Sequence, residues 1–157
     1  MPSCHLCASR SHSRCEPLLL RTVAVVKAET ACEIARLCCL SPSSVADAGW
    51  VVNFAQVAVS EHLDDHRLGV LGAALYRAGR FAEAADALEH AVRLHGQGGS
   101  FADGLFLALT YQRLGHTNDA RRRLEETNKI LKEFKPSSWV VKAELDLLRR
   151  EAESAVR

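Results

Sequence analysis

The chain has 157 residues, of which 48% are hydrophobic and 25% charged, a composition typical of a globular protein large enough to bury a core. Its 20 Lys and Arg residues and 19 Asp and Glu residues nearly cancel, which excludes the strongly basic surface of many nucleic-acid-binding proteins. The longest apolar stretch, residues 18–26, is interrupted by Arg21 and is far shorter than the ~20 residues of a membrane span. We therefore expect neither nucleic acid nor a membrane as a partner.

The first 28 residues differ in composition from the rest. Ser, Cys, His and Arg crowd positions 3–15, and Pro17 disfavours a helix that would continue across it. The segment also lacks the uninterrupted apolar centre and the cleavage-site pattern of a secretory signal. We therefore expect a poorly ordered leader over residues 1–28 and a cytoplasmic location.

One cluster in this leader has the chemistry of a metal site. Cys4, Cys7, His12 and Cys15 could supply the four donors that zinc binds in a tetrahedron. The first spacings are similar to those of a zinc knuckle, but only two residues separate His12 from Cys15, where that family has four. The sequence favours a reduced leader without a cofactor, and a zinc-binding leader that contacts nucleic acid remains the alternative.

From residue 29 onward, apolar residues recur at the spacing of a helix with one buried face, which predicts a first helix over residues 29–40. Its three cysteines are expected to pack as small hydrophobic residues. The break at residues 41–44 contains Pro and three Ser residues, and a second helix is predicted over residues 47–61.

Two clearer helix pairs follow. Residues 67–78 and 81–94 are predicted to form one antiparallel pair, and residues 101–114 and 118–133 the next. Each pair has a glycine in a hairpin that is too short for any further element.

A final helix is predicted over residues 139–156, with Ser138 as its N-cap. We expect it to close the end of the stack with one apolar side. That side contains Trp139, Leu145, Leu148 and Ala152.

The two clear pairs repeat one pattern. Leu71-Gly72-x-x-Leu75-Tyr76-x-x-Gly79 superimposes on Leu107-Ala108-x-x-Tyr111-Gln112-x-x-Gly115 with an offset of 36 residues. The pattern resembles the tetratricopeptide repeat, in which small residues let paired helices cross closely. We expect the following residues to be buried between the helices: Leu71, Leu75, Ala84, Leu88, Leu107, Tyr111, Ala120 and Leu124.

The chain differs from the repeat pattern at several positions, and it also resembles a second group of proteins. Leu68 and Gly104 stand where the repeat has its first aromatic residue, Gly96 replaces its closing Pro, and Thr127 replaces its third small residue. Three segments, residues 36–38, 71–81 and 144–153, also look like the C-terminal repeat tails of large bacterial serine/threonine kinases and related multidomain proteins. The glycine-rich phosphate loop, the His-Arg-Asp run and the Asp-Phe-Gly run of kinases are all absent, so we expect no enzyme.

The resemblance implies an all-α fold of antiparallel helix pairs, stacked as a right-handed solenoid with a capping helix at the end. It places the repeat domain at residues 29–157. The expected units are a degenerate pair at 29–61, repeats at 66–95 and 101–133, and the capping helix at 138–156.

The implied function is binding of a protein or peptide on the concave side, which the first helix of each pair lines, with no small-molecule substrate. By this register His66, Gly69, Ala73, Tyr76 and Arg77 project inward from one helix, followed by Leu105, Leu109, Gln112 and Arg113 from the next. Arg77 and Arg113 at the edge would suit an acidic or mixed peptide. Two alternatives remain: both arginines are merely solvated, or the chain is a detached structural fragment of a kinase-like protein.

Overall fold

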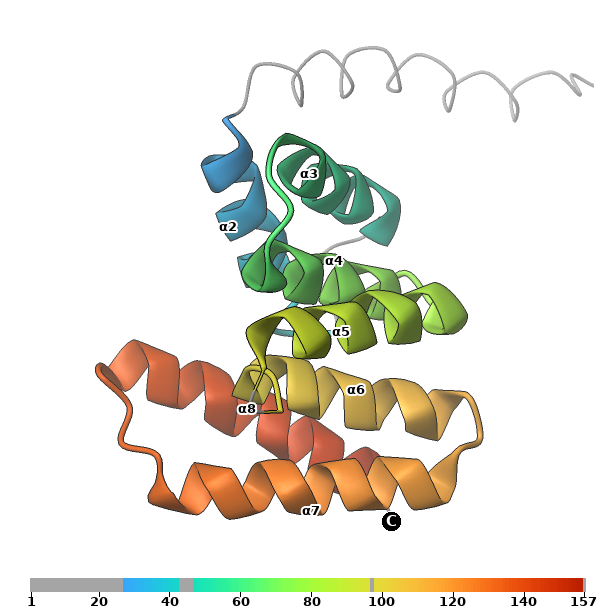
Figure 1. Ribbon diagram of the computed structural model, residues 1–157, viewed down its shortest axis with the longest axis vertical. Coiled ribbons are helices and arrows are strands. Elements are labelled where there is room, and N and C mark those ends of the chain that lie inside the picture. The colour runs from blue at the N-terminus through green and yellow to red at the C-terminus, as the bar shows by residue number, and fades with distance from the viewer. Residues whose placement is uncertain (1–26, 43–46, 97, 157) are drawn as a thin grey trace, which may run out of the picture.

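The computed structural model of the protein describes residues 27–42, 47–96 and 98–156, and within these ranges the chain forms seven helices and no strand. Figure 1 shows them stacked along the long axis of the molecule. They are α2 (Ala28–Cys38), α3 (Ala48–Glu61), α4 (Asp65–Arg77), α5 (Phe81–His95), α6 (Phe101–Arg113), α7 (Thr117–Glu133) and α8 (Trp139–Ala155).

Helix starts follow from capping side chains. Asp47, Asp64, Ser100 and Ser138 each accept a hydrogen bond from a backbone N–H in the first turn of α3, α4, α6 and α8. At the α4–α5 hairpin the backbone turns through Gly79 at a φ of 77°, a conformation that glycine adopts without strain.

Three antiparallel pairs follow one another: α2 with α3, α4 with α5, and α6 with α7 (Figure 1). The second helix of one pair packs on the first helix of the next, and the first helices α2, α4 and α6 also contact each other in sequence. This all-α helix-pair repeat is the predicted fold. No helix in the described part of the chain is long and apolar enough to cross a membrane.

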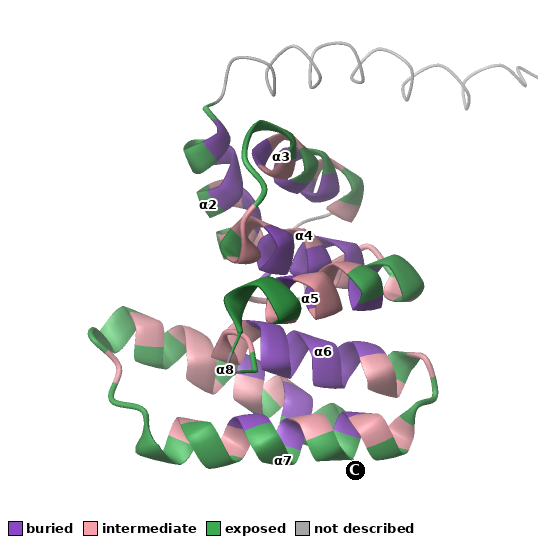
Figure 2. Cartoon of the chain, viewed as in Figure 1, coloured by how far each residue is buried: buried purple, intermediate pink, exposed green. Residues whose placement is uncertain are grey.

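The core runs through the whole stack as one cluster, seen as the purple faces in Figure 2. Six of the eight residues expected in it are buried, namely Leu75, Ala84, Leu88, Leu107, Ala120 and Leu124. The prediction of full burial was wrong for Leu71 and Tyr111, which are partly exposed and pack against the edge of the cluster.

Two glycines set how closely paired helices approach. A Cβ on Gly72 would lie 2.5 Å from Cγ of Leu88 on α5, and a Cβ on Gly104 would lie 2.4 Å from Oγ1 of Thr127 on α7. Gly104 and Thr127 both differ from the repeat pattern, and the two differences compensate each other. The missing side chain on α6 makes room for the larger one on α7.

Helix α8 leaves the repeat register. It packs along α6 but has few contacts with α7, whereas α4 and α6 pack firmly on the preceding second helices α3 and α5. Leu148 and Ala152 are buried as expected. Trp139 was expected on the same side but is 80% exposed, because it lies nine residues, or two and a half turns, before Leu148 and therefore on the opposite face of α8.

Candidate protein-binding surface

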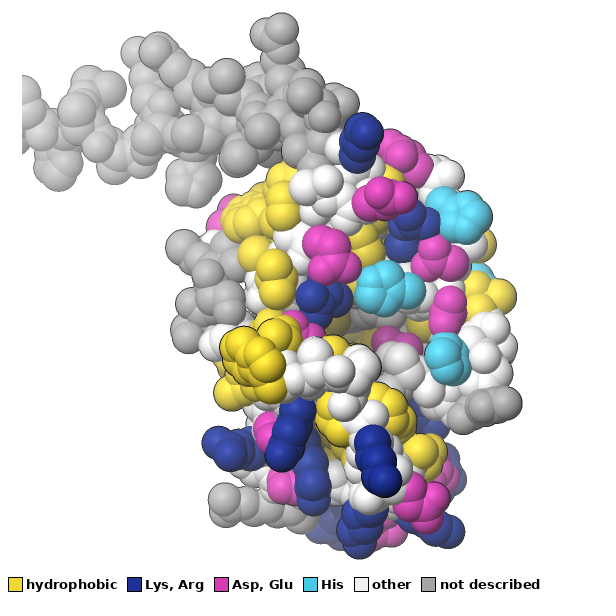
Figure 3. All heavy atoms as spheres, turned by 90° about the vertical axis from the view of Figure 1, so that its left-hand side faces the viewer, with side chains coloured by type: hydrophobic (Ala, Val, Ile, Leu, Met, Phe, Trp, Pro, Cys, Tyr) yellow, Lys and Arg dark blue, Asp and Glu magenta, His cyan; other side chains and the backbone are white. Residues whose placement is uncertain are grey.

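The concave side contains a cavity of about 210 Å³ bounded by α2, α4, α6 and α8. Figure 3 shows this hollowed face, with hydrophobic and histidine side chains around the opening. Val70 and Ala73 of α4, Ala102 and Phe106 of α6, and Leu148 of α8 give it an apolar lining. Residues spaced by three or four on a helix share a face, which is why α4 and α6 each contribute a pair.

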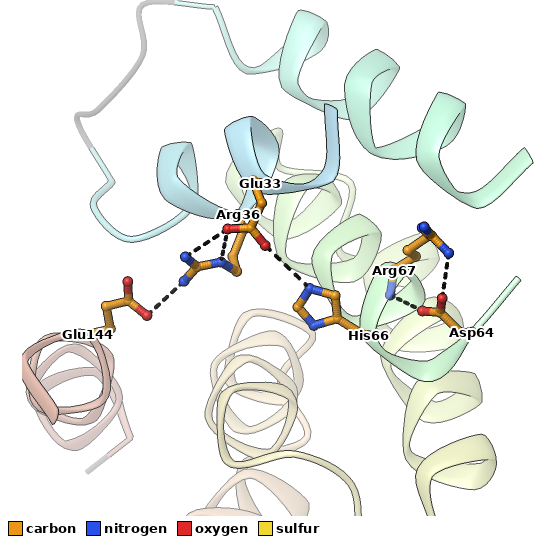
Figure 4. Close-up of polar contacts among 6 residues, drawn as sticks. All are labelled: Glu33, Arg36, Asp64, His66, Arg67 and Glu144. Carbon is orange, nitrogen blue, oxygen red and sulfur yellow. Dashed lines mark hydrogen bonds and ion pairs between the residues drawn. The ribbon is translucent and has the colours of Figure 1, made fainter. Parts of the chain in front are cut away.

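A chain of ionisable side chains borders the α2 side of this cavity (Figure 4). Nη1 of Arg36 on α2 donates to Glu144 of α8 over 2.7 Å, and its Nε donates to Glu33 over 3.1 Å. The other carboxylate oxygen of Glu33 lies 3.9 Å from Nε2 of His66 on α4. The rim therefore connects three helices through alternating acidic and basic side chains.

Asp103 is the polar residue buried deepest in the cavity wall, with 6% of its surface exposed. Ser100 Oγ accepts a hydrogen bond from the backbone N–H of Asp103, and the Asp103 carboxylate accepts one from the backbone N–H of Ser100, which together form a capping box. A Cβ on Gly69 would lie within 2.1 Å of Oδ1 of Asp103, so only glycine lets α4 approach this carboxylate. Burial raises the pKa of Asp103 above its ordinary value, although the bonds to Ser100 act in the opposite direction.

Arg77, expected at the edge of an open groove, is held within the protein. Its Nη1 and Nη2 donate to the two carboxylate oxygens of Glu151 on α8, the latter over 2.7 Å. Its Nε donates to the carbonyl oxygen of Cys39 over 2.8 Å, and its guanidinium lies 5.2 Å from the ring centre of Phe106. The side chain is 8% exposed, so the interpretation of Arg77 as a solvated residue was wrong.

The other predicted groove residues lie in different environments. His66, Gly69 and Ala73 line the cavity. Tyr76 is half-buried against the rings of Phe81 and Phe106, beside Arg77.

Leu105 and Leu109 have no exposed surface, so the prediction that they face an open groove was wrong. Both belong to the core, and α8 packs along the helix that carries them. Arg113 lies 4.9 Å from the ring centre of Phe81 and away from the cavity lining, while Gln112 has a buried side-chain oxygen without a hydrogen-bond partner.

Four residues of this surface were missed from the sequence: Arg36, Asp103, Glu144 and Glu151. Asp103 had a local signal, because Ser100-x-x-Asp103 has the spacing of a capping box. The others had none. Arg36 and Glu144 are 108 residues apart in the chain, and Arg77 and Glu151 are 74 apart.

Within the described residues, no group of three or more His, Cys, Asp or Glu side chains could hold a metal ion. The possible zinc ligands Cys4, Cys7, His12 and Cys15 lie outside the described residues. Cys32 and Cys39 are buried free thiols that pack in the core, as expected, and Cys38 is half-buried.

The structure thus defines a helix-pair repeat protein with an apolar cavity on its concave side. Residues 66–97, which span α4 and α5, match the family model of the tetratricopeptide repeat. This match supports the tetratricopeptide repeat family on the pair whose sequence pattern is most regular. Comparison with curated proteins and with solved structures found no match.

Proposed function

We propose that the protein is a non-catalytic binding module that takes a segment of a partner protein on its concave side, at the cavity between α2, α4, α6 and α8. The cavity itself carries the proposal, because an apolar recess between first helices is left unfilled by the side chains of the described residues. The tetratricopeptide repeat match at residues 66–97 supports the same class of function.

The chemistry of the cavity suits an apolar side chain inserted from a peptide. Its apolar wall would bury that side chain, and the polar rim formed by Glu33, Arg36, His66 and Glu144 would contact the peptide backbone or polar neighbours. A small buried anchor within a polar border is the usual arrangement of a binding hot spot.

Panning a displayed library of random peptides tests this proposal. Ala102→Trp would fill the cavity from the α6 side, whereas Ala82→Trp places the same side chain on an exposed position of α5. We expect peptides selected on the unmodified protein to keep binding Ala82→Trp and to lose binding to Ala102→Trp. Equal binding to both variants, or no selected peptide at all, would contradict a binding site in the cavity.

The second candidate is a structural role, as the detached C-terminal part of a kinase-like multidomain protein. The observation that favours it is α8, which already occupies part of the concave side through Glu144 and Glu151. From the resemblance to bacterial kinase tails we infer a bacterial protein acting as a cytoplasmic scaffold. The same library separates the two roles, because a purely structural fragment selects no peptide at the cavity.

A further inference from the structure

Two ion pairs attach α8 to the concave side. Glu151 accepts hydrogen bonds from both terminal nitrogens of Arg77 on α4, and Glu144 accepts one from Nη1 of Arg36 on α2 over 2.7 Å. The exposed fractions of the two carboxylate side chains are only 21% and 17%. The Arg77–Glu151 pair is bidentate and both pairs are partly buried, which makes them stronger than ordinary surface ion pairs.

The two carboxylates follow helical spacing. Glu144 and Glu151 are seven residues apart, which is two turns and about 10.5 Å along one face of a helix. Leu148 lies between them on that face and is 2% exposed, and Ala152 beside it is fully buried. Helix α8 therefore presents the pattern Glu-Leu-x-x-Leu-x-x-Glu-Ala to two arginines and an apolar floor.

The rest of α8 is loosely attached. A cavity of about 200 Å³ lies between the end of α7 and α8, lined in part by Leu131 and Leu145. Trp139 and Leu147 of α8 are 80% and 53% exposed. A helix held mainly by one neighbour and two ion pairs opens at a lower cost than a helix packed on both sides.

We propose that α8 is an internal occupant of the concave groove, and that the partner is an amphipathic helix with the same chemistry, two carboxylates seven residues apart on either side of an apolar pair, which displaces it. This inference rests on the proposed function and names the partner. Charge complementarity requires a negatively charged partner, because the side chains that form ion pairs with α8 from the concave side are Arg36 and Arg77.

Displacement requires a competitor to overcome a tethered helix. A helix in the same chain has a high effective concentration, so α8 lowers the apparent affinity for any partner by the fraction of molecules in which it is docked. The open cavity beside Val141 and Leu145 gives the partner a first contact while α8 is still in place. Once α8 leaves, the full length of the groove along α6 becomes accessible.

A synthetic fluorescent peptide with the sequence of residues 138–156 serves as the probe, and its binding to the full chain is measured by anisotropy. The double variant Glu144→Gln/Glu151→Gln weakens docking of α8 but leaves Arg36 and Arg77 intact. We expect this variant to bind the peptide about tenfold more tightly than the unmodified chain, because the internal competitor is weaker. The same peptide with both glutamates changed to Gln should not show this tighter binding to the double variant.

Glu125→Gln/Glu133→Gln is the matched control, since it removes two exposed carboxylates from α7. Peptide binding to this control should equal binding to the unmodified chain. The proposal is overturned if the first double variant binds no more tightly than the control, or if the peptide binds equally well without its two carboxylates.

Hydrogen exchange of the unmodified chain provides a second measurement that needs no variant to fold. Saturating peptide should speed amide exchange in α8 and leave α5 unchanged, and unchanged exchange in α8 would count against displacement. A dimer of the unmodified chain that the peptide dissociates would assign the groove to α8 of a second copy instead.

The outcomes are distinguishable from those of the proposed function. Library peptides that depend on the cavity, together with a negative result for residues 138–156, would retain the binding module and reject α8 as its internal occupant.

Discussion

Asp103 shows how one residue serves both helix capping and the cavity. Its carboxylate completes the capping box of α6 with Ser100, and it faces Gly69 where a side chain on α4 would collide with it. Because burial outweighs the hydrogen bonds from Ser100, the pKa of Asp103 is raised, so the folded chain holds this proton more tightly than the unfolded chain. The contribution of Asp103 to the free energy of unfolding then falls as pH rises from 3.8, the ordinary value, through the pKa of Asp103 in the folded chain.

Ser100→Ala tests this residue-scale coupling. Removing the hydroxyl that caps α6 should lower the free energy of unfolding by about 1 kcal/mol. It should also raise the pKa of Asp103 further, because the Ser100 hydroxyl is one of the groups that lower it. Denaturant titrations and carboxyl-carbon NMR measure the two effects. Ser60→Ala, which changes an exposed serine in the last turn of α3, should leave both quantities unchanged.

Cys39 gives a second residue-scale prediction. Burial raises the pKa of its thiol to about 12, although the nearby Arg77 acts in the opposite direction. Since the thiolate is the reactive form, iodoacetamide should modify Cys39 at least about a hundredfold more slowly in the folded chain than in denaturant at mildly alkaline pH. Peptide mapping by mass spectrometry measures this ratio, and a rate independent of denaturant would show that the thiol is accessible.

At the scale of elements, paired departures from the repeat pattern explain each other. Gly104 lacks the large side chain that the repeat pattern has at this position, and Thr127 is larger than the pattern residue opposite. A Cβ at Gly104 would lie 2.4 Å from Thr127 Oγ1, while this hydroxyl donates to the carbonyl oxygen of Arg123. The α6–α7 crossing therefore depends on the pair rather than on either residue.

A double-mutant cycle tests the crossing. Gly104→Ala alone should overpack it and lower the free energy of unfolding by about 1 to 3 kcal/mol. In a Thr127→Ala background, the added methyl group has space, and the higher helix propensity of Ala should make the same change neutral or stabilising by up to about 1 kcal/mol. Urea denaturation of the four proteins gives the coupling free energy between the two positions. Additive effects would contradict a steric contact between them.

Helix bounds were predictable to within a few residues, because their determinants are local. Asp47, Ser100 and Ser138 mark N-caps, and Gly79 marks a hairpin. The exposure of Trp139 was predictable from the sequence but was missed. Trp139 lies nine residues, or two and a half turns, before Leu148, so helical spacing places the two side chains on opposite faces of α8.

On the scale of the whole molecule, Arg77 links helices that are distant in sequence. It contacts the carbonyl oxygen of Cys39 at the end of α2, the ring of Phe106 on α6 and Glu151 on α8. Its position on the concave side was expected from the repeat register, whereas its partners were not, because the chain between them carries no local pattern. From the sequence we expected this arginine to bind an acidic peptide. In the structure its acidic partner is Glu151 of the same chain.

Arg77→Ala tests whether this single side chain holds the two ends of the stack together. The change leaves Glu151 without its partner in a partly buried position and removes the bond to Cys39, so the free energy of unfolding should fall by about 1 to 3 kcal/mol. Because repeat proteins are stabilised mainly between neighbours, the loss should be local. Amide exchange should accelerate in α8 and at the end of α2, and remain slow in α5.

The matched control is Arg80→Ala, which breaks the exposed pair of Arg80 with Glu83 on one turn of α5. Such pairs add little stability, so this variant should unfold at the same denaturant concentration as the unmodified chain. If Arg77→Ala behaves like the control, α8 is held by Leu148 and Ala152 alone. If exchange instead accelerates uniformly across all helices, the stack unfolds as one cooperative unit, and detachment of α8 costs as much as unfolding the whole molecule.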